Sequence, residues 1–158
     1  MGDLSHLDAQ GEARMVDVSG KDVSSRSARA SGAIRMEPQT LNAIRANSLT
    51  KGDVLSVARI AGIMAAKRTS ELIPLCHPLR ITDIQIELVL DDALPGVRVE
   101  ATVRTAAQTG VEMEAITAAS VTLITIYDMA KSIDRGMVIT DICLEEKVGG
   151  KSGPWRRG

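Results

Sequence analysis

Apolar residues recur every three or four positions between residues 53 and 68, which is the spacing of a helix with one buried face. Asp53 precedes the first of them and is a suitable N-cap, so we expect a helix that ends near Lys67. Gly62 lies inside this helix, where glycine costs about 1 kcal/mol relative to alanine. We therefore expect another element to approach closely at Gly62.

Apolar and polar residues alternate in two later segments, 81–90 and 97–107, which is the period of a half-buried strand. A turn at Leu94–Gly96 separates the two segments, so together they predict an antiparallel hairpin. Two further strands are expected, one near Ala30–Met36 and one over residues 137–147.

The longest helix is expected after Gly110, over residues 111–131, and its residues are apolar nearly all round. A helix of this kind is buried on more than one side. Because a sheet covers only one side, we expect this helix to contact a second subunit as well. A short helix of one or two turns is expected at Thr40–Ala46.

The order of these elements is strand, helix, two strands, helix, strand. It predicts an α+β protein with the ferredoxin-like, split βαβ arrangement, an antiparallel sheet with helices on one face, and an oligomeric state. A single domain is expected over residues 15–153, which begins with an extended, solvated arm over residues 15–30. Residues 1–14 are expected to be a disordered tail, and residues 154–158 the flexible end of the glycine-rich stretch that starts at Val148.

Composition limits the kinds of partner. The 158 residues include no Phe, one Trp and one Tyr, so aliphatic side chains must fill the core. The 19 Lys and Arg residues are balanced by 20 Asp and Glu residues. Because nucleic-acid binders usually carry a basic excess and aromatic platforms, we expect no nucleic-acid partner.

The sequence also predicts a cellular location. The N-terminal segment lacks the apolar core of a signal peptide, and the longest uncharged stretch, Ala115–Tyr127, is too short to span a bilayer. We expect a cytoplasmic protein with no membrane partner, whose two cysteines, Cys76 and Cys143, are reduced.

Asp128 and Lys131 are the first candidates for chemistry, because residues i and i+3 share one face of a helix. They could form an ordinary surface ion pair, but their place at the end of an apolar, buried helix favours a catalytic pair. Glu114 precedes Asp128 by fourteen residues, or about 21 Å along a straight helix. If both carboxylates serve one small substrate, they come from different chains.

Cys76 and His77 lie between Pro74 and Pro78, which hold an extended, rigid loop. A zinc site needs three or four ligands, and beyond carboxylates only His6 and the distant Cys143 are left to complete one. Two interpretations of this loop stay open. Cys76 could be a core cysteine beside a loop histidine, or the loop could bind a substrate to which His77 forms a hydrogen bond.

Several basic residues are candidates for binding an anion. Lys51 precedes a helix N-terminus, where free N–H groups favour anions, whereas Lys67 at the other end suits the helix dipole without any further role. Residues 149–152 read GGKS, but a P-loop needs a glycine at the position of Glu145. Two interpretations of this segment stay open: a phosphate-binding loop that carries Lys147 and Lys151, and a disordered tail. Phosphate binding likewise stays open, without being favoured, for Arg26 and Arg29 in the N-terminal arm.

Two long segments resemble one known family. KGDVLSVARIAGIMAAKRTSELIPLCHPL (51–79) and TGVEMEAITAASVTLITIYDMAK (109–131) resemble the signature blocks of the cyclic pyranopterin monophosphate synthases. MVDVSGKDVSSRSARA (15–30) resembles the start of the family's core, and GGKSG (149–153) its end. The resemblance implies a ferredoxin-like subunit in a homohexamer, a trimer of dimers, with active sites at subunit interfaces.

The same resemblance implies a lyase acting on a nucleotide-derived small molecule. The activity converts (8S)-3',8-cyclo-7,8-dihydroguanosine 5'-triphosphate to cyclic pyranopterin monophosphate with release of pyrophosphate, early in molybdenum cofactor biosynthesis. No organic cofactor and no protein-bound metal are implied, although Mg²⁺ can accompany the triphosphate. The implied catalytic residues are Asp128, Lys131, Lys51 and Lys67, and the implied substrate-binding residues are Leu75, Cys76, His77, Met113, Glu114, Lys147, Glu112 and Arg26.

Two alternatives from other classes stay open at this point. One is a zinc-dependent GTP ring-opening hydrolase that uses Cys76 and His77. The other is a non-catalytic nucleotide-binding module, because the ferredoxin-like fold hosts many functions.

Overall fold

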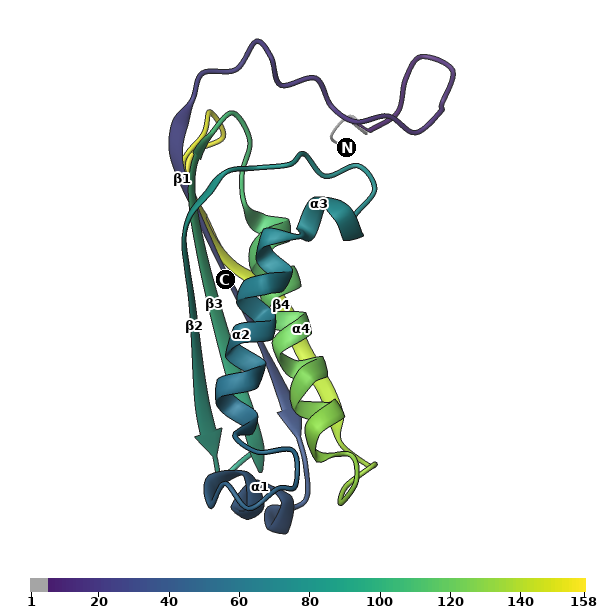
Figure 1. Cartoon of the computed structure of the whole chain (residues 1–158). Coiled ribbons are helices and arrows are strands. Elements are labelled where there is room, and N and C mark those ends of the chain that lie inside the picture. The colour runs from purple at the N-terminus through teal and green to yellow at the C-terminus, as the bar shows by residue number, and fades with distance from the viewer. Residues whose placement is uncertain (1–5) are drawn as a thin grey trace.

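An antiparallel sheet runs the length of the molecule, with its strands in the order β2-β3-β1-β4-β5 (Figure 1). The structure is a computed structural model that describes residues 6–158. The strands within this range are β1 (Ser24–Arg35), β2 (Ile81–Asp91), β3 (Gly96–Ala107), β4 (Val138–Val148) and β5 (Trp155–Arg156). The order and directions of the first four strands confirm the predicted ferredoxin-like arrangement.

The two long helices, α2 (Val54–Lys67) and α4 (Glu112–Ala130), lie side by side on one face of the sheet (Figure 1). Asp53 caps α2, as predicted, because its carboxylate accepts a hydrogen bond from the backbone N–H of Ser56 at 3.0 Å. The predicted helical turns near residue 40 are α1 (Pro38–Arg45), at the far end of the molecule from the N-terminal arm.

Small side chains allow the two long helices to pack closely. A Cβ at Gly62 of α2 would collide with the Thr122 hydroxyl of α4 and with Ile86 of β2. Alanine dominates the faces that meet, including Ala58 on α2 and Ala118 on α4, both fully buried. The close approach that the glycine predicted is therefore present, and it fixes the position of α2 against α4.

Two elements differ from the sequence-based expectations. The first strand begins at Ser24 rather than near Ala30, because its polar side chains find partners on neighbouring strands: Arg29 contacts Glu100 at 2.7 Å and Glu146 at 3.7 Å. A short helix, α3 (Thr69–Leu72), follows α2.

The chain end differs as well. Instead of a flexible end, residues 155–156 form β5, which pairs with residues 146–147 of β4, and Arg156 forms an ion pair with Glu146 at 3.1 Å. Of the expected N-terminal tail, residues 1–5 lie outside the described range, and residues 6–14 form a turn closed by a bridge between Leu7 and Ala13.

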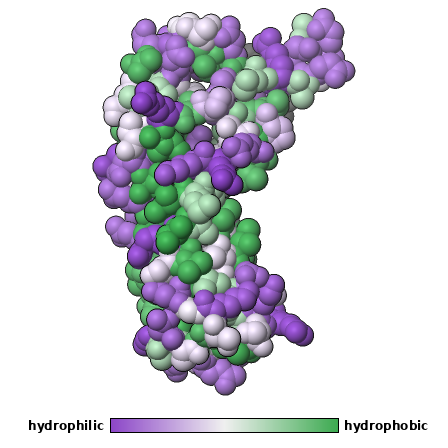
Figure 2. All heavy atoms as spheres, in the orientation of Figure 1, coloured by the Kyte–Doolittle hydropathy of each residue, from purple (hydrophilic) through white to green (hydrophobic). Residues whose placement is uncertain are grey.

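Apolar side chains gather on the surface over the middle of the molecule, where α2 lies, whereas polar side chains cover both ends (Figure 2). Val57, Ile60 and Met64 of α2 are exposed, and so is Ile124 of α4. We call these four side chains the apolar helix surface. Within residues 6–158, no helix combines the length and the hydropathy needed to cross a membrane.

Candidate active site

At the C-terminal end of α4 the Asp128 carboxylate contacts two lysines, and we call these three residues the lysine–aspartate cluster. Lys131 lies one turn further along the chain, with its Nζ 2.7 Å from Asp128 Oδ1. Lys51 precedes α2, and its Nζ lies 2.8 Å from Asp128 Oδ2 and 3.1 Å from the Asp128 carbonyl oxygen. The packing of α2 against α4 therefore adds a second lysine to the predicted pair.

The cluster carries an excess of positive charge and faces solvent. Hydrogen bonds from Lys131 and Lys51, together with their charges, lower the pKa of Asp128 to about 2. About half of each side chain is exposed. Asp128 is therefore an anion at neutral pH that holds two ammonium groups in place, and those groups can bind a phosphate or donate protons.

At the N-terminal end of α4, Glu114 is almost fully buried beside Cys76. Its side chain is 2% exposed, Oε1 accepts a hydrogen bond from Cys76 Sγ at 3.7 Å, and Oε2 has no partner within the described residues. Burial raises the pKa of Glu114, although its hydrogen bonds act in the opposite direction. A buried carboxyl oxygen without a partner is a strong acceptor for an N–H group of a ligand.

Cys76 is not suited to be a nucleophile here. Burial, together with the charge of Glu114, raises the pKa of its thiol to about 11. The thiol is therefore protonated at neutral pH, and thiolate is the form that attacks carbon or binds metal.

The neighbouring His77 holds the N-terminal arm, which crosses this end of the molecule (Figure 1). Its Nε2 lies 2.6 Å from the Val16 carbonyl oxygen. Leu75, in the same loop, is half-buried, and Met113 is 38% exposed next to Glu114. The loop 75–77 and the start of α4 thus meet through the contact between Cys76 and Glu114.

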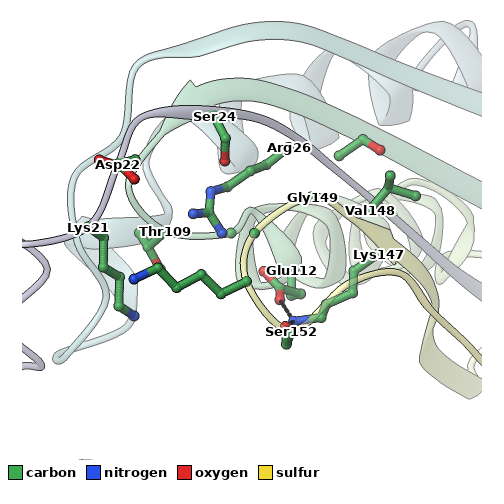
Figure 3. Close-up of a pocket in the computed structure, with 14 residues that line it drawn as sticks. Lys21, Asp22, Ser24, Arg26, Thr109, Glu112, Lys147, Val148, Gly149 and Ser152 are labelled. Carbon is green, nitrogen blue, oxygen red and sulfur yellow. Dashed lines mark hydrogen bonds and ion pairs between the residues drawn. The ribbon is translucent and has the colours of Figure 1, made fainter.

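A cavity of about 520 Å³ lies where the start of α4 meets the end of β4 (Figure 3). Three predicted residues line it: Arg26, Glu112 and Lys147. Lys147 Nζ lies 3.5 Å from Glu112 Oε1 and 3.1 Å from Ser152 Oγ. Arg26 Nε donates to the Ala107 carbonyl oxygen at 2.9 Å.

Lys21, Asp22 and Ser152 also line this cavity and were not predicted from the sequence, whereas Lys151 was one of two open possibilities. The GGKS stretch was the available signal for Lys151 and Ser152. For Lys21 and Asp22 the sequence offers no signal, because they lie in a polar arm without a regular pattern.

The predicted residues do not meet at one point in a single chain. Asp128 is fourteen residues beyond Glu114 on one continuous helix, which corresponds to about 21 Å. Lys67 joins neither end: it lines another hollow, of about 500 Å³, beside Ile63 and Asp83.

Within residues 6–158, no group of three or more His, Cys, Asp and Glu side chains is arranged to hold a metal ion. Nothing therefore supports the zinc-hydrolase alternative, which requires such a group. Asp22 and Glu112 line the cavity, and one or two carboxylates with phosphate oxygens are the usual ligands of Mg²⁺. The donors present suit Mg²⁺ that arrives with a phosphate ligand.

Comparison with known proteins gives consistent matches over nearly the whole chain. A family model described as the MoaC family matches residues 15–150. The cyclic pyranopterin monophosphate synthase of Dinoroseobacter shibae is 62% identical over 153 residues, with 97% of each chain covered. The synthase of Parvibaculum lavamentivorans is 61% identical over 153 residues, with 97% of this chain and 96% of the relative covered. That of Brucella ovis is 58% identical over 154 residues, with 98% and 93% covered.

Proposed function

The chain belongs to the MoaC family, and we propose that it acts as a cyclic pyranopterin monophosphate synthase on (8S)-3',8-cyclo-7,8-dihydroguanosine 5'-triphosphate. The match to synthases at 58–62% identity over nearly the full length supports this activity. The observation that carries the chemistry is the lysine–aspartate cluster, because the reaction requires proton donors beside groups that neutralise phosphate charge.

The last bond changes of this reaction suit two ammonium groups. A hydroxyl oxygen of the rearranged substrate attacks the α-phosphorus, its proton passes to a base, and the bond from that phosphorus to the β-phosphate oxygen breaks. Pyrophosphate leaves, and the cyclic monophosphate is formed. Lys51 and Lys131 are placed to neutralise the charge that develops on the phosphate oxygens.

Asp128 serves the reaction mainly by orienting the two lysines. With a pKa of about 2 its carboxylate is a weak base, so it draws little proton from a hydroxyl group. Its two hydrogen bonds, at 2.7 and 2.8 Å, instead fix the directions of the lysine Nζ groups.

The other end of α4 binds the purine-derived ring. Glu114 offers a desolvated oxygen without a partner, which suits the N–H donors of a guanine-like ring. Leu75, His77 and Met113 surround this end, and His77 can offer a hydrogen bond once it is released from Val16. Mg²⁺, held by Asp22 and Glu112 together with substrate phosphates, would supply charge neutralisation.

We further propose that two chains complete each site in a homohexamer, a trimer of dimers. The separation of Glu114 from Asp128 along one helix supports this arrangement, because one reacting centre cannot contact both. The apolar helix surface supplies side chains that a subunit contact would bury.

The activity is tested by incubating the purified protein with the cyclised dihydro-GTP substrate and measuring pyrophosphate and the fluorescence of the oxidised pterin. We expect equal amounts of both products, and loss of both in Asp128→Ala. Tight substrate binding without either product would identify a non-catalytic nucleotide-binding module instead.

The shared site has its own test. Asp128→Ala and Glu114→Ala variants, each inactive alone, are unfolded together, refolded and assayed. If each site takes Glu114 from one chain and Asp128 from another, some mixed sites are intact and activity returns. If mixing restores nothing although each variant assembles, the two residues act within one chain.

A further inference from the structure

We propose, resting on the synthase activity proposed above, that residues 155–157 are positioning residues, which hold Lys147 in the direction that its role in the site requires. Lys147 lines the cavity at the start of α4, and residues 149–152 form the adjoining wall. Residues 155–157 do not line the cavity, and they lie outside residues 15–150, the range that the family model matches. What they contribute to the site is therefore exerted through Lys147 and the loop that follows it.

The strand β5 closes this loop at its base. Its antiparallel pairing with β4 places Arg156 opposite Glu146 and Trp155 opposite Lys147. Residues 148–154 are therefore anchored to the sheet at both ends, whereas without β5 they would be anchored at one end only. Loss of β5 would restore the conformational freedom of the whole segment, and its contacts with Lys147 would be lost with it.

Arg157 extends the pairing by two hydrogen bonds to the backbone of β4. Its backbone N–H donates to the Glu145 carbonyl oxygen at 2.9 Å, and its Nε donates to the Leu144 carbonyl oxygen at 2.9 Å. Three consecutive residues thus contact the last residues of β4. Because the acceptors are backbone groups, these contacts fix the chain itself just before Lys147.

A row of alternating charges on one face of the sheet holds β5 in place. Glu146 contacts Arg156 at 3.1 Å and Arg29 at 3.7 Å, and Arg29 contacts Glu100 at 2.7 Å. The row therefore connects four neighbouring strands, β3, β1, β4 and β5. A single exposed ion pair stabilises a protein little, but a connected row restricts every member, Arg156 included.

Trp155 and Lys147 lie on the opposite face, because successive residues of a strand point to opposite sides of the sheet. This is the face that α4 covers, and Lys147 Nζ there lies 3.5 Å from Glu112 Oε1 and 3.1 Å from Ser152 Oγ (Figure 3). Directly opposed side chains of antiparallel strands are neighbours, so the indole of Trp155 lies beside the aliphatic stem of Lys147. The stem is thus restricted by β5, and the ammonium group by the loop.

The loop itself depends on this closure. Gly149, Gly150 and Gly153 have φ values of +97°, +84° and +71°, and the N–H of Gly153 donates to the Gly150 carbonyl oxygen at 3.2 Å. Glycine adopts such values without strain but loses more conformational freedom than other residues when it is ordered. The loop that places Ser152 on Lys147 is therefore costly to order, and pairing at its base offsets that cost.

The first test measures the freedom of the Lys147 amine and requires no substrate. Full-length protein is treated with an acetylating reagent, and the acetylation rate of each lysine is followed by mass spectrometry. Deletion of residues 155–158 should raise the rate at Lys147 several-fold, because its Nζ loses a fixed direction, and Trp155→Ala should raise it less. Lys67, which lines another hollow, is the internal control and should react at an unchanged rate.

The second test separates positioning from stability by steady-state kinetics. Trp155→Ala should raise the KM for the cyclised dihydro-GTP substrate by about tenfold with little change in kcat, the pattern of a lost binding contact to a charged group. Trp155→Phe should retain a nearly normal KM, because it keeps an aromatic side chain beside the lysine stem. Arg45→Ala removes an exposed ion pair with Asp92 at the other end of the molecule and should behave as the wild type does. Thermal unfolding followed by circular dichroism checks that each variant is folded.

The outcomes distinguish this proposal from the proposed function. Unchanged acetylation of Lys147 in both the deletion and Trp155→Ala would overturn the positioning role, whether or not the wild type is active. Faster acetylation with an unchanged KM in an active enzyme would show that β5 holds Lys147 without serving the reaction, and would also overturn the proposal. If acetylation rises as expected but the wild type forms no product, the contact is supported and the proposed function fails.

Discussion

Two carboxylates at opposite ends of α4 have opposite properties. Glu114, in the first turn, is 2% exposed, and burial raises its pKa. Asp128, in the last turn, is about half exposed, and Lys131 and Lys51 lower its pKa to about 2. The helix dipole alone predicts the reverse, since it stabilises anions at the N-terminus and disfavours them at the C-terminus.

The difference shows that the local surroundings of each carboxyl group affect its pKa more than the helix dipole does. A dipole contributes roughly 0.3–1 kcal/mol near a helix end, and burial or two adjacent cations contribute more. One helix can therefore present a carboxyl group with a raised pKa at one end and a carboxyl group with a lowered pKa at the other. In the proposed reaction the first recognises N–H donors and the second orients lysines.

The largest effect is expected at the charged end. Asp128→Ala should lower turnover by roughly 10²–10³-fold, because Lys51 and Lys131 lose the group that orients them. Asp128→Asn, which keeps the shape without the charge, should lose nearly as much. Pyrophosphate release measures the rate, and size-exclusion chromatography checks that assembly is unchanged. A near-normal rate in Asp128→Asn would show that charge at this end is not needed.

The pH dependence at this end follows from the same pair of contacts. The pKa of Asp128 is lowered from 3.8 to about 2, so its ion pairs are fully present above about pH 4 and are lost only as the pH falls toward 2. Titration of Asp128 should thus produce no change in rate above about pH 4. An acidic limb near neutral pH that disappears in Asp128→Asn would contradict this assignment.

The Cys76 thiol, at the buried end of α4, should react slowly with alkylating reagents. At pH 8, a thiol pKa of about 11 instead of 9.0 lowers the thiolate fraction of Cys76 about 100-fold. Iodoacetamide should therefore modify Cys76 at least that much more slowly in the folded protein than in urea, as followed by mass spectrometry. Glu114→Gln should speed the modification, because it removes a negative charge beside the thiol. Equal rates in folded and unfolded protein would contradict the buried environment.

A substitution at the contact between α2 and α4, midway between the two ends of α4, tests whether helix packing stabilises the protein and positions Lys51. Gly62→Ala should lower the free energy of unfolding by about 1–3 kcal/mol, because its Cβ would collide with Thr122 and Ile86. Gly20→Ala is a matched control, since nothing lies within 4 Å of a Cβ at that position. Urea denaturation compares the two variants. A stable Gly62→Ala protein with full activity would show that α2 can shift without disturbing Lys51.

The smallest effect is expected from Glu114→Gln on stability. Because burial raises the pKa of Glu114 above 4.5, the contribution of Glu114 to stability is fully present below that pH and is lost as the pH rises through the raised value. The Gln variant should lack this loss, so its stability should fall less than that of the wild type between pH 4 and 8. Unfolding curves of both proteins between pH 4 and 8 measure it, and parallel curves would mean that Glu114 is not desolvated.

The periodic parts of the fold could be predicted from the sequence, and the irregular parts could not. The Asp53 cap, the hairpin and α4 follow from local spacing. The start of β1 at Ser24 does not, because its polar residues become strand only through partners such as Glu100 on another strand. β5 is similar, since only pairing with β4 identifies it.

The contacts of the candidate site are likewise of two kinds, those that local spacing predicts and those that it does not. The contact between Asp128 and Lys131 follows from their spacing on one helix. The contacts of Lys51 with Asp128 and of Cys76 with Glu114 join residues 77 and 38 positions apart, so they depend on how α2, α4 and the proline-bounded loop pack. No local pattern encodes these distances.

The near absence of aromatic residues has a practical consequence. The chain has one tryptophan, Trp155, which pairs with Lys147 at the edge of the cavity, and one tyrosine, Tyr127, which precedes Asp128. Tyr127 donates its hydroxyl proton to the Arg135 carbonyl oxygen at 3.0 Å. Each proposed binding region thus has its own native chromophore. Tryptophan emission can therefore report, without a label, on occupancy of the cavity that Lys147 lines, and Tyr127 marks the lysine–aspartate cluster.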